Sequence, residues 1–433
     1  MVDEKSQINI YEVAKKIIAQ RNFITISELK KFFVYEEGVY LPKGESVVNQ
    51  ILVDSLKGKA TKNLRNEIIE QIKIITEVSE EDINLELSDD YICVNNGILN
   101  AKTRKIIDHN PKYIFFSKLP VDYVKGVKCP IFENFIKEVV KPYEAEQLQE
   151  FVGYTLMTNT AKYEKGIILQ GEGGRGKSTF LKIVTELLGK NNVTAFTLQQ
   201  LQDKVILVEL HGKIANISMD IPKDRLLNVE HIKSITSGDR ITGRGLFKGP
   251  LTFVPNCKMM FSCNNLPEPT YGNDRAFFSR WVYIKFIGPN FREPDEFGIR
   301  KAIGDYDRII VKKELSGILN WALEGYEMVN LTQFSDVDAN ETRIKWMRNS
   351  NNTMVYAFDR LVQTYDSNDV IKKRDVYSDY ERYCKINQET PLSQRSFHPK
   401  LKELLGLEEC HTKKNDTIQR PAWRGIKFKD GGI

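Results

Sequence analysis

A glycine-rich segment contains the residues with the clearest chemistry in this 433-residue chain. It fits the pattern G-x-x-x-x-G-K-[ST] and reads Gly171-Glu172-Gly173-Gly174-Arg175-Gly176-Lys177-Ser178-Thr179. In such a loop, glycines let backbone N–H groups turn inward around phosphates, and the helix that follows adds partial positive charge. Lys177 would reach the β- and γ-phosphates, and Ser178 would bind Mg²⁺. The whole segment therefore predicts a site for ATP and Mg²⁺.

The residues around this segment predict the two elements that such a loop needs. The apolar run 166–170 leads into it as a buried strand would. Residues 180–188 follow with the apolar spacing of a helix and end at Gly189, a natural helix cap. A surface loop that matched the pattern by chance would lack this context, so we expect an α/β P-loop nucleoside triphosphatase (NTPase) core.

Two other predicted strands end in polar residues. Residues 213–220 end in Asp220, and residues 258–263 are followed by Asn264. The carboxyl ends of parallel strands lie beside the phosphates in this class of fold. Asp220 is therefore a candidate for binding Mg²⁺ or orienting the attacking water, although a simple strand-end cap is the alternative. Asn264 could sense the γ-phosphate, because an amide both donates and accepts hydrogen bonds.

Basic residues suggest contacts with other molecules. Residues 239–253 alternate and turn like a hairpin with basic residues and glycines near its tip. Arg244 and Lys248 are candidate contacts for a nucleic-acid backbone, whereas a solvated surface hairpin is the alternative. Arg280 precedes a last predicted strand, 282–286, and could reach a nucleotide held by a neighbouring subunit.

The flanking sequence predicts three further regions. Residues 1–75 predict a mainly helical region, and residues 76–160 predict short strands, including 113–116, followed by helices. The core is expected to occupy 161–348. Residues 353–433 predict three helices and a β-wing with frequent basic residues, which favours a winged-helix nucleic-acid binder over a plain helical cap.

Composition narrows the class of protein. The 41% hydrophobic and 28% charged fractions are typical of a soluble globular chain, and the length suits two to four domains. The net charge is only +5, so local clusters of basic residues must bind any anionic partner. No apolar run approaches the roughly 18–20 residues of a membrane span, so no membrane partner is expected. The six cysteines form no C-x-x-C pair, and His398, Cys410 and His411 lack a fourth ligand, so we expect reduced thiols rather than a zinc site.

The order of these motifs resembles the superfamily 3 helicases and, more narrowly, the phage, plasmid and poxvirus primase–helicase group. Besides the P-loop and the strand-end acid, the resemblance depends on Ser-Gly-Asp-Arg at 237–240, Phe-Ser-x-Asn-x-Leu-Pro at 261–267 and Phe-Phe-x-Arg-Trp at 277–281. Upstream, residues 94–99 and 129–132 resemble that group's pre-helicase region. The resemblance covers nearly the whole chain and is weakest over its first sixty or so residues.

The resemblance implies an AAA+-like superfamily 3 helicase core with an α+β region before it. Asp220 would belong to the acidic motif, Asn264 would be the sensor, and Arg280 would act on the adjacent protomer as an arginine finger. The hairpin would line the channel of a ring, with Lys248 gripping DNA. Family members are typically hexamers that move 3′→5′ on single-stranded DNA. The expected partners are single-stranded and forked DNA, further copies of the chain, and a separate primase or polymerase, in the host cytoplasm of a virus or plasmid.

One departure from the family pattern leaves the catalytic base open. Many relatives carry two adjacent acids where this chain has Met219-Asp220. Metal binding and water activation cannot then be divided between neighbours. Asp224 or Glu209 could serve as the base, or Asp220 could perform both tasks.

Priming is not expected of this chain. The group often carries a polymerase-like primase domain upstream, and the chain leaves no room for one. The triplet Asp336-Val337-Asp338 lies in a polar stretch, whereas two-metal chemistry needs acids on a rigid scaffold.

Two functions remain in competition. The first is an ATP-dependent replicative helicase that translocates on single-stranded DNA as a ring. The second is an ATP-switched, DNA-binding replication initiator or loader without processive unwinding. Met219 and the basic tail are compatible with this alternative. A small-molecule P-loop kinase would explain neither the hairpin nor the tail.

Overall fold

The computed structural model describes the chain in segments, and every structural statement below concerns these residues: 9–26, 31–56, 60–79, 90–157, 162–222, 229–245, 250–267, 274–291, 293, 303–334, 338–350, 352–364, 366–387, 390–412 and 419–429. The chain forms two compact units. The first contains Met1–Ile221, Asn228–Asn264 and Arg280–Val337. The second contains Pro222–Leu227, Asn265–Ser279 and Asp338–Ile433.

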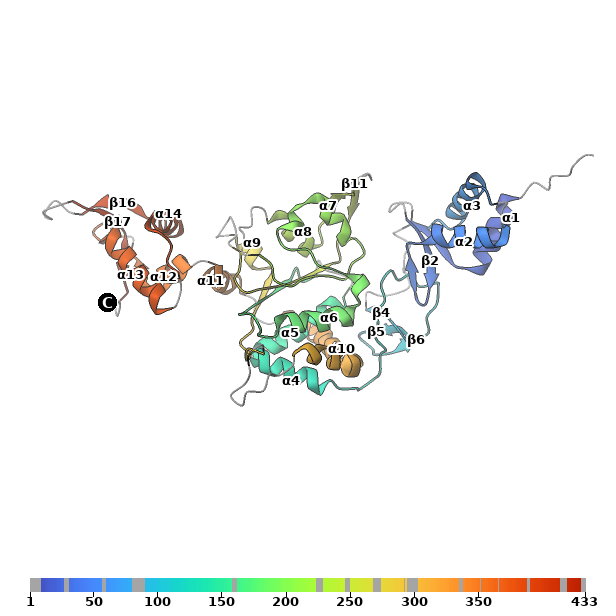
Figure 1. Ribbon diagram of the computed structural model, residues 1–433, viewed down its shortest axis with the longest axis horizontal. Coiled ribbons are helices and arrows are strands. Elements are labelled where there is room, and N and C mark those ends of the chain that lie inside the picture. Colours follow the sequence, from blue (N-terminus) through green and yellow to red (C-terminus); the bar gives the residue numbers. More distant parts are fainter. Residues whose placement is uncertain are drawn as a thin grey trace, which may run out of the picture. The chain divides into compact units, whose positions relative to one another are not determined.

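A five-stranded parallel sheet forms the centre of the first unit (Figure 1). Its strands, in spatial order, are β13 (Trp281–Lys285), β7 (Gly166–Gln170), β12 (Lys258–Cys263), β9 (Ala215–Ser218) and β8 (Val193–Thr194). Parallel sheets are covered on both faces, which explains why β7 and β12 are almost continuously apolar. The prediction of a strand before the glycine-rich segment is confirmed.

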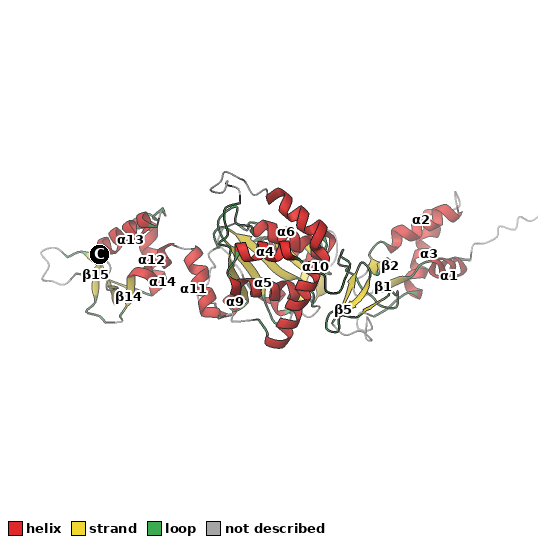
Figure 2. Ribbon diagram, turned by 90° about the horizontal axis from the view of Figure 1, so that it is seen from below, coloured by secondary structure: helices red, strands yellow, loops and turns green. Residues whose placement is uncertain are grey.

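Helices enclose this sheet (Figure 2). One side carries α4 (Pro130–Val139), α5 (Pro142–Thr155), α6 (Lys177–Leu188) and α10 (Ile303–Thr332), and the other carries α7 (Lys204–Leu207) and α8 (Glu230–Ser237) (Figure 1). Helices α5 and α10 cross at glycines, since a Cβ atom at Gly153 would lie 2.1 Å from the backbone nitrogen of Tyr326. None of the described helices is long and apolar enough to cross a membrane.

The amino-terminal part of the first unit contains its own small sheets. Strands β1 (Phe23–Ile26), β2 (Lys31–Glu36) and β3 (Val39–Leu41) pair antiparallel and pack with α1 (Ile10–Gln20), α2 (Gly44–Leu56) and α3 (Lys62–Ile75). A second antiparallel sheet follows, formed by β4 (Tyr91–Val94), β5 (Gly97–Asn100) and β6 (Ile106–Ile107). The predicted strand at 113–116 is wrong, because these residues form bends and irregular backbone instead.

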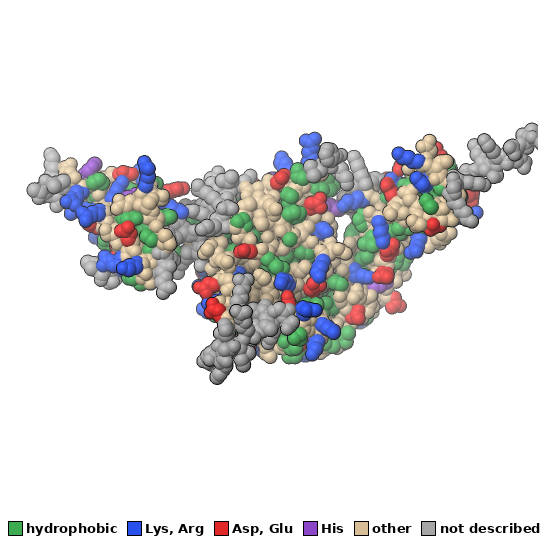
Figure 3. Space-filling model, in the orientation of Figure 1, with side chains coloured by type: hydrophobic (Ala, Val, Ile, Leu, Met, Phe, Trp, Pro, Cys, Tyr) green, Lys and Arg blue, Asp and Glu red, His purple; other side chains and the backbone are tan. Residues whose placement is uncertain are grey.

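The second unit has a separate aromatic core. Trp346 of α11 (Ala339–Ser350) packs edge-on against Phe277 and Phe278 of α9 (Arg275–Phe278). Further along are α12 (Asn352–Arg360), β14 (Leu361–Gln363), β15 (Val370–Lys372), α13 (Lys373–Ile386), α14 (Gln394–Leu405), β16 (Glu408–His411), β17 (Pro421–Arg424) and β18 (Ile426–Phe428). The strands form two sheets, β14-β18 and β15-β17-β16. Lys and Arg side chains are spread over the visible face of these elements (Figure 3).

Candidate nucleotide-binding site

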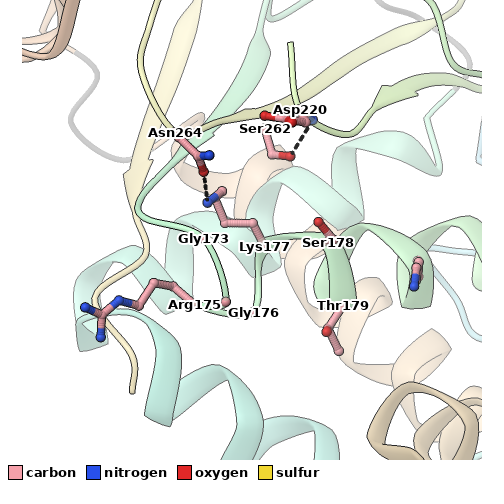
Figure 4. Close-up of a pocket in the computed structure, with 11 residues that line it drawn as sticks. Gly173, Arg175, Gly176, Lys177, Ser178, Thr179, Asp220, Ser262 and Asn264 are labelled. Carbon is pink, nitrogen blue, oxygen red and sulfur yellow. Dashed lines mark hydrogen bonds between the residues drawn. The ribbon is translucent and has the colours of Figure 1, made fainter. Parts of the chain in front are cut away.

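The glycine-rich segment forms a loop between β7 and α6, as predicted. Gly174 (φ 83°) and Gly176 (φ 93°) adopt left-handed conformations that residues with a Cβ atom rarely adopt. Gly176 is the residue before the first turn of α6. The loop borders a pocket at the carboxyl end of the sheet (Figure 4), lined by Gly173, Gly174, Arg175, Gly176, Lys177, Ser178, Thr179, Lys182, Asp220, Ser262 and Asn264.

The ammonium group of Lys177 lies inside this loop. The residue is only 7% exposed. Its Nζ donates hydrogen bonds to the carbonyl oxygens of Gly171 (2.5 Å) and Glu172 (2.8 Å) and to Oδ1 of Asn264 (3.1 Å). These acceptors hold a positive charge beside the loop, where it can form charge-assisted hydrogen bonds to phosphate oxygens.

Asn264 is held in place by a chain of hydrogen bonds from the next two strands. The amide of Gln170 donates to the carbonyl oxygen of Asn264 (2.9 Å). The hydroxyl of Tyr283 on β13 donates to Oε1 of Gln170 (3.0 Å). Burial raises the pKa of Tyr283, so its hydroxyl keeps the proton that it donates. The sequence did not indicate Gln170 or Tyr283, since their partners lie far away along the chain.

Asp220 lies two residues after the end of β9, at the opposite side of the pocket from the loop (Figure 4). It adopts a left-handed backbone conformation with φ 70°. Its N–H donates to Oγ of Ser262 (3.2 Å), a pocket residue on β12 that sequence reasoning missed. Among the described residues that line the pocket, Asp220 is the one with a carboxylate.

Of the other two candidate bases, only Glu209 is described, and it does not join Asp220 at the pocket. Glu209 belongs to the 3₁₀ turn η5 (Val208–Leu210) and is not among the described residues that line the pocket. Asp224 lies outside the described residues, as does Asp336 of the acidic triplet.

Two side chains of the loop point outward. Arg175 donates to the carbonyl oxygen of Gly288 (2.7 Å) and pairs with the Glu172 carboxylate (2.5 Å). This hydrogen bond from Arg175 lowers the pKa of Glu172. Figure 4 shows the Arg175 guanidinium directed away from Lys177 and Asn264. Neither Gly171 nor Glu172 is among the described residues that line the pocket.

Arg280 lies at the amino ends of the strands, whereas the pocket lies at their carboxyl ends. Its carbonyl oxygen accepts a hydrogen bond from the N–H of Gly166, the first residue of β7, whereas the loop follows the last residue of that strand. At about 3.3 Å per residue, the five-residue strand separates the two by roughly 16 Å. The guanidinium donates to Oγ of Ser237 (2.7 Å) and pairs with Glu164 (3.2 Å). The structure therefore does not bring Arg280 to the pocket of its own subunit.

The predicted hairpin is present in its described part. Strands β10 (Ile241–Arg244) and β11 (Pro250–Phe253) pair antiparallel, with Arg244 opposite Pro250. Arg244 is exposed near the tip. Lys248 lies outside the described residues.

Solved structures resemble this fold. The apo structure of the C-terminal region of NrS-1 aligns with a TM-score of 0.54 and 12% identity, covering 98% of this chain and 100% of that one. Its A form aligns with a TM-score of 0.51 and 12% identity, covering 96% and 98%. Together with the parallel sheet and the glycine-rich loop, this likeness defines an α/β NTPase core.

Comparisons of sequence find similarity to D5-like proteins over parts of the chain. Three family models match: "D5 N terminal like" over residues 11–141, a family of unknown function (DUF5906) over residues 169–280, and "Poxvirus D5 protein-like" over residues 348–423. A protein of Acanthamoeba polyphaga mimivirus named "Putative helicase L207/L206" is 31% identical over 140 residues. That match spans 31% of this chain and 14% of the viral protein. These matches confirm the resemblance to the D5-like group of superfamily 3 helicases.

Proposed function

We propose that the chain is an ATP-dependent DNA helicase that moves 3′→5′ along single-stranded DNA as a ring, in the host cytoplasm, during replication of a virus, plasmid or integrated element. The observation that carries this proposal is the convergence of Lys177, Asp220 and Asn264 on one pocket from three different elements. The matches to the D5-like family models support the coupling of that pocket to DNA.

The pocket residues fit ATP and Mg²⁺. Ser178 and Asp220 present hydroxyl and carboxylate oxygens, the ligand types that Mg²⁺ prefers. The bound metal would neutralise charge on the β- and γ-phosphates. Lys177 would neutralise further charge, and the loop N–H groups would hold the phosphates in place. Asn264, fixed through Gln170, would orient the attacking water.

The proposed ring follows from the position of Arg280. An arginine at the far edge of the sheet cannot complete the pocket of its own subunit, so we assign it to the nucleotide of the adjacent protomer. An arginine finger contributes roughly 10³–10⁵ in rate, so isolated subunits should hydrolyse ATP slowly. A hexamer is the assembly that the family resemblance implies.

Two regions are proposed to contact DNA. Arg244 and Lys248 of the hairpin would bind the phosphate backbone in the channel. Residues 353–433 would form a winged-helix-like DNA-binding domain, supported by helices α12, α13 and α14 beside two small sheets. Exposed basic residues in the described part of this region include Arg374, Arg395, Lys402 and Arg424. A separate primase or polymerase is the proposed source of primers.

A second function is favoured by the chemistry of the pocket. Asp220 is the one carboxylate that its described residues contribute. A single carboxylate that binds Mg²⁺ could activate water only poorly. Hydrolysis would then be slow, and ATP would act as an assembly switch. The chain would then be an initiator or loader that binds DNA without processive unwinding.

A strand-displacement assay on a forked duplex separates the two functions, with ATP turnover and molecular mass measured on the same sample. The helicase should separate strands with ATP, and Lys177→Ala should abolish turnover and displacement while DNA binding persists. DNA-dependent assembly with ATP but without displacement would favour the initiator. Full turnover by Lys177→Ala would remove the loop from the mechanism.

The hairpin has its own test. Lys248→Ala should lose DNA-stimulated turnover and displacement but keep basal hydrolysis, because the lysine is assigned to DNA rather than to ATP. Lys102→Ala, which removes an exposed lysine in a turn after β5, is the matched control and should behave as wild type. A Lys248→Ala variant that unwinds at the wild-type rate would refute the role of the hairpin.

A further inference from the structure

Ser262 is a polar residue in an almost continuously apolar strand. It lies on β12 opposite Leu169 of β7 and is 1% exposed. Its Oγ accepts a hydrogen bond from the N–H of Asp220 (3.2 Å), and its carbonyl oxygen accepts one from the N–H of Ile221 (2.8 Å). One buried residue therefore holds two successive N–H groups of the segment that follows β9.

That segment has an unfavourable backbone conformation. Asp220 has φ 70°, in the left-handed region that residues with a Cβ atom adopt at an energetic cost. Such a conformation persists where surrounding contacts hold it. The two hydrogen bonds that Ser262 accepts are such contacts, and the left-handed turn brings Asp220 to the border of the pocket (Figure 4).

The end of β12 also contacts the loop lysine on the other side of the pocket. Asn264 follows Ser262 by two residues, and its Oδ1 accepts the hydrogen bond from Lys177. The strand thus fixes the acid through Ser262 and the lysine through Asn264. A rigid strand preserves the spacing between the two groups better than a loop does.

We propose that Ser262 is a positioning residue whose hydroxyl holds Asp220 in the left-handed conformation that presents its carboxylate to a magnesium–nucleotide complex. This inference rests on the proposed function, which assigns Mg²⁺ to Asp220 and Ser178. It matters more here than in a pocket with two neighbouring acids, because Met219 supplies no second carboxylate. Loss of the hydroxyl should therefore weaken the contribution of Mg²⁺ without affecting the loop.

The test is binding of a fluorescent ATP analogue by the full chain, with Mg²⁺ and with EDTA. Ser262→Ala should weaken binding with Mg²⁺ by roughly three- to tenfold, the effect of one lost hydrogen bond, and leave binding in EDTA unchanged. Ser262→Thr restores the hydroxyl and should recover the wild-type affinity. Ser218→Ala removes a serine of β9 that is also buried, at 3% exposure, and should bind as wild type in both conditions.

A double-mutant cycle distinguishes positioning from general support of the fold. In an Asp220→Asn background, Ser262→Ala should have no further effect on binding with Mg²⁺. The proposal is overturned if Ser262→Ala weakens binding equally with Mg²⁺ and with EDTA, or if its effect persists beside Asp220→Asn. A wild-type chain that binds no nucleotide would instead overturn the proposed function and this inference with it.

Discussion

Lys258 is a second buried lysine in the sheet, and its surroundings differ from those of Lys177. It is the first residue of β12, at the end of the strand away from the pocket, and is 1% exposed. Its Nζ donates to the carbonyl oxygen of Met157 and to Oδ1 of Asn256 (2.9 Å) and lies 5.4 Å from the centre of the Tyr154 ring. Burial lowers the pKa of Lys258 from 10.5 to about 7. The lysine thus joins the end of α5 to the strand that carries Ser262.

This burial predicts a dependence of stability on pH. Between pH 7 and 10.5, Lys258 is protonated in the unfolded chain and largely neutral in the folded one. The unfolded state binds more protons there, so the contribution of Lys258 to stability should rise with pH across this interval. Lys258→Met should remove that rise, measured as the thermal unfolding midpoint at several pH values. Lys190→Met, at a lysine side chain that is 73% exposed, should keep the wild-type slope. An unchanged slope in Lys258→Met would contradict the assignment.

At the residue scale, the sequence predicted groups that act within one segment. Lys177 was identifiable because the loop chemistry fixes both its type and its spacing. Ser262, Gln170 and Tyr283 were not, since each acts through a partner on another strand. The Tyr283–Gln170 contact, for example, joins residues 113 positions apart. No local pattern marks such a pair.

Among the elements, the β10–β11 hairpin is closely bound to the segment before β9. A Cβ atom at Gly243 would lie 2.4 Å from Cγ2 of Val208 and 2.9 Å from the carbonyl oxygen of Lys204. The backbone of β10 therefore lies directly on α7 and η5. The same segment continues into β9, which ends two residues before Asp220. A displacement of the β10–β11 hairpin would therefore need to cross only this short stretch to reach Asp220.

Gly243→Ala tests that contact. The added methyl group cannot fit against the backbone of α7, so the hairpin should move and stimulation of ATP turnover by DNA should fall at least tenfold, while nucleotide affinity stays within about twofold. Turnover and nucleotide binding are measured on the same preparation. Thr242→Ala, at the exposed neighbouring position, is the control and should retain stimulation. Normal stimulation in Gly243→Ala would show that hairpin docking is irrelevant to coupling.

At the element scale, periodicity predicted the strands and helices of the core well. The helix after the glycine-rich loop ends at Gly189 as predicted, and strands β10 and β11 lie within the predicted hairpin. The prediction failed at 113–116, where apolar residues pack against the amino-terminal sheet instead of pairing. Phe116 contacts Phe33, with ring centroids 5.0 Å apart, and the carbonyl oxygen of Phe115 accepts from the N–H of Tyr40 (2.7 Å). A short apolar run does not reveal which of these uses it serves.

For the whole molecule, the position of Arg280 is the basis of the proposal that one active site needs two subunits. The guanidinium pairs with Glu164 and Ser237 at the edge of the sheet opposite the pocket. To act on a neighbouring nucleotide, it must exchange these partners for a phosphate. The sequence shows that Arg280 precedes the last strand, but only the sheet register shows that it lies at the end of the sheet away from the pocket.

Mixing inactive variants tests this division of labour. Arg280→Ala and Lys177→Ala should each be inactive alone, because one lacks the finger and the other lacks the loop lysine. Mixed rings should recover part of the wild-type turnover, since some interfaces then contain both groups. A chain carrying both substitutions, mixed with either single variant, should give less recovery. If no mixing ratio restores turnover, Arg280 does not act between subunits.

The most direct test of the account is ATP turnover per subunit across a dilution series, with and without single-stranded DNA and with mass determined at each concentration. The account predicts that turnover falls sharply as assemblies dissociate and rises when DNA is added to the assembled chain. A monomer that hydrolyses ATP at the full rate, whether or not DNA is present, would contradict it.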